Sequence, residues 1–337
     1  MGSNLLIASM LPVIEAKLQQ VVSRLDEPRT RIFHEMLTYH LGWSGDGAGP
    51  DATGKRIRPL LVLLSCAACG GNWQNALSAA ACLELIHNFS LAHDDIQDGS
   101  ILRRGRLAVW KKWGMAQAIN VGDALFILAQ LTLLEQNNLF PPEITMKAGA
   151  LINTACLELS TGQFLDLAYE DRADMTIDDY LAMISGKTAA LLSACTQIGS
   201  VLGGADDVIQ QKYRSFGHFL GLAFQMQDDY LGIWGDMELT GKSIESDLVA
   251  GKKTLPVLFG LKKQGEFARR WAEGPISYAE VRDLSEQLAK EGAKLYTQHS
   301  AEEMTDMALQ SLRSAAPHGE AGSALYDLTN ILLNRQS

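Results

Sequence analysis

The chain has little of what marks several other protein classes. Only five of its 337 residues are cysteines, and aromatic residues make up 7%. An odd, small number of cysteines in a long chain forms no disulfide framework, which is typical of a reducing compartment. Basic residues are outnumbered by acidic ones, 29 to 39, so the formal charge is −10. A chain this acidic lacks the basic face that binds nucleic acid, and we expect no such partner.

Targeting signals and linkers are also scarce. The N-terminal stretch 4–25 mixes acidic and basic residues, unlike the positive start and apolar run of a signal peptide. No run of about 18 uncharged apolar residues stands out as a membrane span. The one loop-like cluster, rich in glycine, covers 42–54 and lies too early to separate two cores. We therefore expect a cytoplasmic protein of one domain without a membrane span.

Apolar residues, at 47% of the chain, are abundant and follow a helical period. The pattern predicts long, largely buried helices at 60–68, 76–92, 116–134, 144–167, 188–202 and 213–234. Strand signals are rare, and glycine or proline pairs fall between the periodic segments. The sequence predicts an all-α fold, with N-terminal helices and a loop over 1–53, a catalytic core over 54–260 and outer helices over 261–337.

Two of the predicted helices end in adjacent aspartates. The first ends in Asp94-Asp95-Ile96-Gln97-Asp98, and the second in Asp228-Asp229. Carboxylates at the C-terminus of an apolar helix oppose the helix dipole and repel one another unless a cation lies between them. Oxygen-only ligands suit Mg²⁺, which takes one or two carboxylates and completes its shell with water and substrate phosphates. Both ends are therefore candidate magnesium sites.

Positive charge is gathered in short clusters, several of them directly after a glycine. These clusters are 54–59 (GKRIRP), 103–106 (RRGR), 186–188 (GKT), 241–242 (GK) and 251–253 (GKK). A single cluster would be read as surface solvation. Five clusters in an acidic chain with two aspartate pairs indicate a site for a polyanion such as a diphosphate.

With these motifs, the chain resembles the trans-isoprenyl diphosphate synthases (polyprenyl synthetases), the family that includes farnesyl and geranylgeranyl diphosphate synthases. The resemblance runs from Gly54 to Lys252 and rests on the order and spacing of several motifs. It implies a helical bundle around a central apolar cavity and a prenyltransferase that joins an allylic diphosphate to isopentenyl diphosphate. It also implies three Mg²⁺ ions with substrate bound, replaceable by Mn²⁺, and a homodimer.

The resemblance also assigns roles to individual residues. Asp94, Asp98 and Asp228 would ligate Mg²⁺, with Asp95, Asp229 and Asp247 in support. The contacts to the allylic diphosphate would be Arg103, Lys187, Gln225, Lys242 and Lys252. The pocket for isopentenyl diphosphate would contain Lys55, Arg58, His87 and Arg104. Gln163 and Asp166 would lie on a helix that lines the reaction chamber, and Thr188 would bind substrate.

The second aspartate motif departs from the family pattern DDxxD. Gly232 stands where the third carboxylate is expected, and Asp236 or Asp247 could compensate for it. A class I terpene cyclase is one alternative, but the chain lacks that family's hydroxyl and glutamate in the second motif. A non-catalytic partner subunit is another, although such a subunit would be expected to lose one aspartate motif.

The residues before the first motif bear on product length. The growing chain would pass Phe89, Ser90 and Ile86, with the Phe89 ring as a floor. An aromatic residue five positions before Asp94, with no insertion in the motif, resembles synthases of the geranylgeranyl (C20) type. Farnesyl (C15) and longer products stay open as alternatives.

Overall fold

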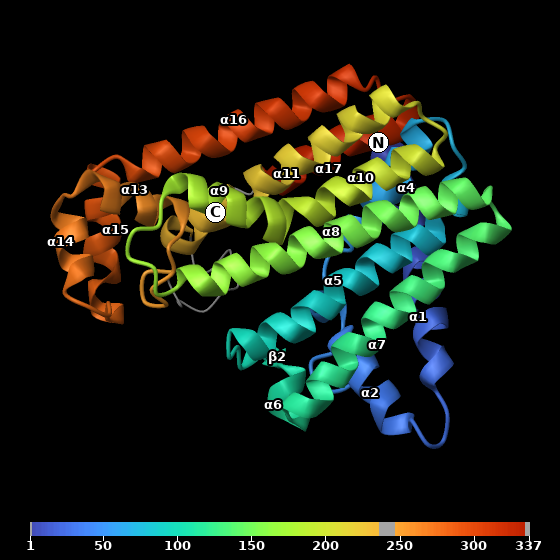
Figure 1. Ribbon diagram of the computed structural model, residues 1–337, viewed down its shortest axis with the longest axis horizontal. Coiled ribbons are helices and arrows are strands. Elements are labelled where there is room, and N and C mark those ends of the chain that lie inside the picture. Colours follow the sequence, from blue (N-terminus) through green and yellow to red (C-terminus); the bar gives the residue numbers. More distant parts are fainter. Residues whose placement is uncertain (1, 236–246, 334–337) are drawn as a thin grey trace. The chain divides into compact units, whose positions relative to one another are not determined.

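A computed structural model describes residues 2–235 and 247–333 (Figure 1). Its helices are, in chain order, α1 (Gly2–Val22), α2 (Arg31–His40), α3 (Pro50–Thr53), α4 (Ile57–Ala68), α5 (Leu77–Gln97), α6 (Val109–Trp113), α7 (Met115–Leu134), α8 (Pro142–Tyr169), α9 (Ile177–Ile184), α10 (Ala190–Leu202), α11 (Asp207–Trp234), α13 (Leu255–Lys263), α14 (Glu266–Ala272), α15 (Val281–Lys290), α16 (Ala293–Ser314) and α17 (Gly319–Leu333). A π-helical turn, Ser185–Ala189, joins α9 to α10. The strands in the described residues are β1 (Leu102–Arg103) and β2 (Arg106–Leu107), which form a hairpin.

The predicted all-α fold is confirmed, and the six predicted helices appear with ends shifted by a few residues. The second aspartate pair lies about one turn before the end of its helix, since α11 ends at Trp234, as the predicted range 213–234 does. That last turn is held because Ile233 and Trp234 pack against a buried cluster that includes Val257 and Phe267.

Contacts within the chain divide it into two compact units. Of the described residues, unit 1 contains 2–153, 195–210 and 317–325, and unit 2 contains 154–194, 211–316 and 326–333. Helices α8, α10, α11 and α17 contribute residues to both units. The single-domain organisation stays a prediction.

In unit 1 the apolar helix α5 lies between α4 and α7, and it runs alongside α7 in Figure 1. Its residues from Ala79 to Leu83 have no exposed surface, and neither do Leu61 to Leu64 of α4. Close packing of this kind fixes the direction in which α5 ends. That end carries the first aspartate motif.

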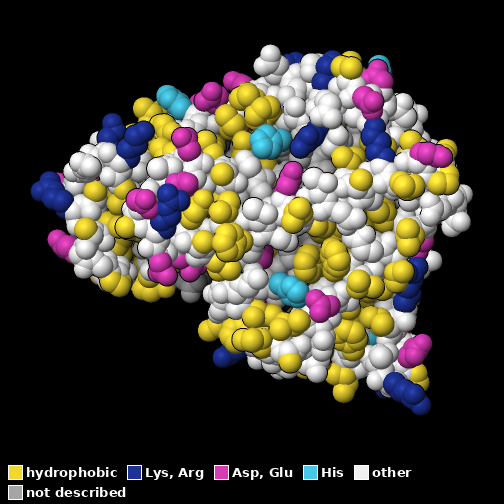
Figure 2. Space-filling model, in the orientation of Figure 1, with side chains coloured by type: hydrophobic (Ala, Val, Ile, Leu, Met, Phe, Trp, Pro, Cys, Tyr) yellow, Lys and Arg dark blue, Asp and Glu magenta, His cyan; other side chains and the backbone are white. Residues whose placement is uncertain are grey.

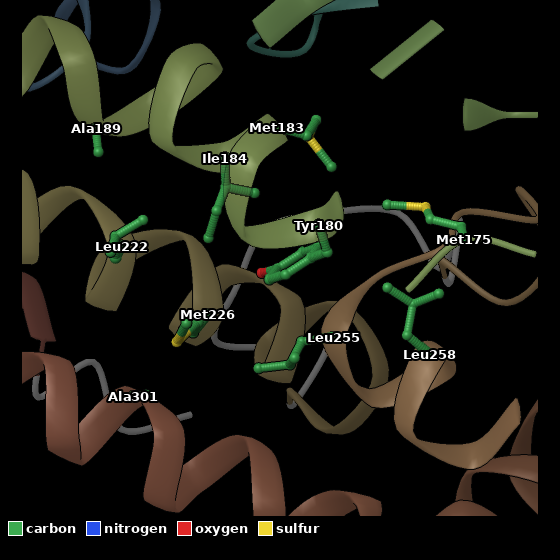
Figure 3. Close-up of a cluster of buried hydrophobic side chains, with 10 residues drawn as sticks. All are labelled: Met175, Tyr180, Met183, Ile184, Ala189, Leu222, Met226, Leu255, Leu258 and Ala301. Carbon is green, nitrogen blue, oxygen red and sulfur yellow. The ribbon is translucent and has the colours of Figure 1, made fainter. Parts of the chain in front are cut away.

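Unit 2 has its own core around Tyr180 of α9 (Figure 3). The Tyr180 ring lies among Met226 of α11 and Leu255 of α13, with Ile184 one turn further along its own helix. Only 1% of Tyr180 is exposed. The core therefore joins α9, α11 and α13, the elements around the second aspartate motif.

Two helices are long and apolar enough to cross a membrane by length and composition, Leu5–Leu25 and Met115–Asn138. No membrane span was predicted there from the sequence. The core helix of a soluble protein passes the same test, and 44% of the apolar window of the second helix is buried within the chain. The two helices are thus weak evidence for a membrane span.

The buried imidazole of His40, on α2, makes the stability of the fold depend on pH. Burial lowers the pKa of His40 to about 4 from 6.5, against the opposing effect of its hydrogen bond with the Asn88 carbonyl. The charges of Arg104, Arg103 and Arg106 lower it further. The unfolded chain takes up this proton below about pH 6.5 and the folded chain only near pH 4. The folded chain should therefore lose stability as the pH is lowered from about 6.5 to about 4.

We predict that His40→Gln will flatten this pH dependence, because Gln keeps a hydrogen-bond donor but does not titrate. The wild-type chain should lose up to about 3 kcal/mol more unfolding free energy than the variant between pH 6.5 and pH 4. Urea unfolding of both proteins across this range measures the difference. Parallel stability curves would contradict the assignment.

Candidate active site

The first aspartate motif lies at the C-terminal end of α5 in unit 1. The backbone N–H of Asp98 donates to the carbonyl of Asp94 at 2.8 Å, so both carboxylates project from one face of the last turn. Asp95, 1% exposed, points to another side and accepts from Arg103 Nε at 2.9 Å. Burial raises the pKa of Asp95, and the Arg103 guanidinium opposes that rise. Asp94 and Asp98 are thus the pair that can bind a cation, while Asp95 anchors Arg103.

Basic side chains gather beside this motif. Arg58, His87 and Arg104 are each half-buried, and Arg58 Nε is buried without a hydrogen-bond partner among the described residues. Burial and the nearby charges of Arg58, Arg104 and Arg103 hold the pKa of His87 well below its usual value. Burial likewise lowers the pKa of Arg58 and of Arg104. Unit 1 therefore holds a cationic cluster, Arg58 and Arg104 beside the neutral His87 ring, in which Arg58 keeps an unsatisfied donor for an anion.

The hairpin supplies two of these cations. Arg104 and Gly105 form its turn with φ of 53° and 73°, as a two-residue type I′ turn requires. Arg103, paired in register with Arg106, reaches Asp95, and Arg104 Nη1 donates to the Ala52 carbonyl at 2.8 Å. The hairpin was missed in the sequence because each strand is only two residues long. Lys55, the remaining predicted residue of this pocket, is exposed.

In unit 2, Asp229 is the centre of a buried network. Its carboxylate accepts from Tyr180 Oη at 2.7 Å, from the Leu255 N–H at 3.0 Å and from Gln225 Nε2 at 2.9 Å. Gln225 in turn accepts from Thr188 Oγ1 at 2.8 Å. Burial raises the pKa of Asp229 to about 7, against the effect of these donors. Asp229 thus fixes the positions of Gln225 and Thr188, whereas its neighbour Asp228 is half-buried.

Lys187 lies on the π-helical turn and forms an ion pair with Asp166 of α8. A Cβ on Gly162 would lie 2.1 Å from the Lys187 backbone nitrogen, so α8 can approach the turn this closely only with glycine there. The same close contact explains Gly186, whose added Cβ would meet the Glu158 carbonyl at 2.6 Å. The glycine before Lys187 therefore serves helix packing.

Asp247 occupies the space beside Gly232. A Cβ on Gly232 would lie 2.1 Å from Asp247 Oδ2, and Lys252 Nζ lies 4.0 Å from Asp247 Oδ1. A carboxylate thus stands close to where the third motif residue would carry one, but it comes from Asp247. Lys242 and Asp236, both named from the sequence, lie outside the described residues.

The predicted chain-length residues lie on α5 as expected. Ile86 is fully buried, Ser90 donates to the His87 carbonyl at 2.9 Å, and Phe89 is half-buried. The Phe89 ring centroid lies 5.1 Å from that of Phe126 on α7. Phe126, which the sequence analysis did not name, therefore packs against Phe89 from α7.

Four other buried residues were given no role from the sequence: His40, Tyr180, and Arg56 with Glu84, whose carboxylate accepts from Arg56 Nη1 at 2.8 Å. Glu84 stands three residues before His87 on an apolar helix, and a charge there was a usable signal. Tyr180 lies 49 residues from Asp229 and carries no comparable signal.

We predict that Gly232→Ala will lower the free energy of unfolding by about 1–3 kcal/mol, because the new methyl group overlaps the Asp247 carboxylate. The double variant Gly232→Ala/Asp247→Ala should recover most of the loss, which thermal unfolding measures as a coupling. Gly149→Ala is the matched control, since a Cβ there meets only a Leu133 methyl group at 3.6 Å. A Gly232→Ala variant as stable as wild type would contradict this packing.

Known proteins resemble this chain over most of its length. A family model described as polyprenyl synthetase matches residues 49–287. A geranylgeranyl diphosphate synthase of Mycobacterium tuberculosis is 36% identical over 323 residues, which cover 94% of this chain and 90% of that protein. A (2E,6E)-farnesyl diphosphate synthase of Mycobacterium bovis is 36% identical over 335 residues, covering 96% and 91%.

Solved structures give the same result. The crystal structure of geranylgeranyl pyrophosphate synthetase from Pyrococcus horikoshii matches with a TM-score of 0.88 and 33% identity, covering 98% of this chain and 97% of that chain. A polyprenyl synthetase from Streptomyces coelicolor matches with a TM-score of 0.86 and 34% identity, covering 96% and 97%. With the family model spanning most of its length, this chain belongs to the polyprenyl synthetase family.

Proposed function

We propose that the protein is a short-chain prenyl diphosphate synthase, which condenses an allylic diphosphate with isopentenyl diphosphate. The observation that carries this proposal is the cationic cluster of unit 1. The buried Nε of Arg58 has no hydrogen-bond partner among the described residues, and the neighbouring Arg103 and Arg104 guanidiniums add positive charge next to an acidic helix end. A diphosphate supplies the missing acceptors. The names of the relatives support the same substrate class.

The donor set fits Mg²⁺. Asp94 and Asp98 in unit 1 and Asp228 in unit 2 are the proposed ligands, and all are oxygen donors. No group of three or more His, Cys, Asp or Glu side chains is placed to hold a metal within residues 2–235 and 247–333. That suits an ion which completes its shell with water and substrate phosphates. When bound, Mg²⁺ would stabilise the negative charge that develops on the leaving diphosphate.

The protein's own residues have three tasks in the proposed reaction. Lys187, Gln225, Lys242 and Lys252 contact the allylic diphosphate as its C–O bond breaks and the electron pair leaves with the diphosphate. Lys55, Arg58, His87 and Arg104 hold isopentenyl diphosphate, whose double bond attacks the allylic cation. Its C2 proton then passes to the released diphosphate. Apolar helix walls exclude the water that would quench the cation.

The proposal includes a homodimer. Exposed apolar side chains form one face of α7: Met115, Ile119, Ile127, Leu131 and Leu134. Hydrophobic side chains are visible at the surface along this helix in Figure 2. Beside them is a groove of about 660 Å³, whose lining includes Phe33 of α2. A surface of this kind suits a second copy of the chain. The small, odd number of cysteines supports a cytoplasmic location.

For the product, we propose geranylgeranyl diphosphate. Phe89 with Phe126 across from it would close the path of the growing chain, with Ser90 leaving room beside them. Relatives named as geranylgeranyl synthases support this length, and the farnesyl-named relatives keep C15 as the second candidate.

We predict that turnover will require added Mg²⁺ and stop in excess chelator. Asp94→Ala and Asp228→Ala should each lower kcat by about two orders of magnitude, as for loss of a major electrostatic contact. Prenyl transfer from labelled isopentenyl diphosphate measures this. Asp178→Ala, at an exposed position in the first turn of α9, is the control and should keep wild-type turnover. Full turnover in chelator would refute the proposed function.

We predict that Phe89→Ala will shift products to longer chains with activity largely kept. Each extra prenyl unit buries apolar surface at about 25 cal/mol per Å² once the ring is gone. Ser90→Phe should shorten the product towards C15. Chromatographic sizing of the products tests both variants. Phe259→Ala, which removes a ring stacked on Tyr296 in unit 2, should leave chain length unchanged. Unchanged products from Phe89→Ala and Ser90→Phe would mean that another helix sets the length.

A further inference from the structure

Of the three cations Lys55, Arg56 and Arg58, Arg56 is the most buried, and it forms ion pairs with two carboxylates. Its side chain is 3% exposed and lies in unit 1 between two carboxylates. Nη1 donates to Glu84 at 2.8 Å, and Nε and Nη2 donate to the two carboxylate oxygens of Glu15 at 3.0 and 3.1 Å. Its backbone has φ 51° and ψ 36°, an unfavourable left-handed conformation for arginine. The ion pairs hold this conformation at the start of α4.

Glu84 is a buried carboxylate within range of the cationic cluster. It is 2% exposed and sits on α5, one turn before His87. Its negative charge raises the pKa of both Arg58 and Arg104, against the larger effect of their burial. An anion that interacts with these two guanidiniums competes electrostatically with any diphosphate that binds them.

Arg56 offsets that competition. Besides Arg56, Glu84 accepts a hydrogen bond only from Asn88 Nδ2, at 3.1 Å, among the contacts of its described surroundings. Arg56 therefore supplies the one full positive charge bonded to Glu84. Glu15 adds a second carboxylate, which also accepts from Trp43 Nε1, and so ties α1 to the start of α4.

We propose that Arg56 is a positioning residue of the isopentenyl diphosphate pocket. It neutralises Glu84, so that the charges of Arg58 and Arg104 remain available to the substrate diphosphate. This inference rests on the proposed function, because it assigns that cluster to isopentenyl diphosphate. Arg56 itself is sealed by its two carboxylates and does not contact the substrate.

The test is calorimetric titration of the full chain with isopentenyl diphosphate in EDTA, which excludes metal-dependent binding. Arg56→Gln should weaken binding about tenfold to a hundredfold, because it leaves Glu84 without its charged partner. Adding Glu84→Gln to that variant should restore affinity to within about threefold of wild type, since the opposing charge is then gone. A purely structural role for Arg56 would not give this rescue.

Arg24→Gln is the matched control. It breaks another arginine–carboxylate pair of unit 1, with Glu135, and should bind as tightly as wild type. Circular dichroism and thermal unfolding check that each variant folds. If Arg56→Gln does not fold, Glu84→Gln alone is decisive: binding at least as tight as wild type supports the inference, and weaker binding overturns it.

The outcomes separate this inference from the proposed function. A wild-type chain that does not bind isopentenyl diphosphate in EDTA refutes the metal-free pocket, and the inference with it. A wild type that binds, with Arg56→Gln binding equally well or with no rescue by Glu84→Gln, overturns the inference alone.

Discussion

The rest of the account depends on the positive charge of two buried guanidiniums in unit 1, which the neighbouring carboxylates balance only in part. The packing of α4, α5 and the hairpin buries Arg58 and Arg104, and burial lowers the pKa of each. Removing a guanidinium from water costs free energy unless an anion balances it. Glu84 provides part of that balance, and we propose that Arg56 limits how much. A diphosphate that binds there would balance the remaining positive charge, and this contributes to its binding free energy.

In unit 2, by contrast, the buried carboxylate of Asp229 is surrounded by hydrogen-bond donors. Asp229 accepts three hydrogen bonds and is 3% exposed, so its role is to hold Tyr180, Gln225 and the start of α13 together. Adjacent aspartates thus differ sharply in their surroundings. The same division appears in unit 1, where Asp95 binds Arg103 while Asp94 and Asp98 share another face of the helix. In each motif, a buried aspartate holds the geometry in which its neighbour can act.

Helical periodicity was enough to predict the long helices, because apolar residues on α4, α5 and α7 repeat at the helical spacing. Sequence motifs also indicated Asp94, Asp98 and Arg58 as candidate site residues, and the structure places Asp94 and Asp98 on one face of the last turn of α5. The contacts of Asp229 with Tyr180 and of Gly232 with Asp247 could not be predicted, since they join segments whose approach depends on tertiary packing. The hairpin was not predicted because each strand is only two residues long. Its geometry follows from the φ angles of Arg104 and Gly105, not from strand propensity.

The central claim is that this chain by itself joins isopentenyl units to an allylic diphosphate and stops at C20. The most direct measurement is to incubate the purified protein with Mg²⁺, isopentenyl diphosphate and either dimethylallyl, geranyl or farnesyl diphosphate, and to identify the products by mass spectrometry. The account predicts geranylgeranyl diphosphate from each primer. A dominant C15 or longer product would contradict the chain-length assignment, and no condensation with any primer would contradict the proposed function.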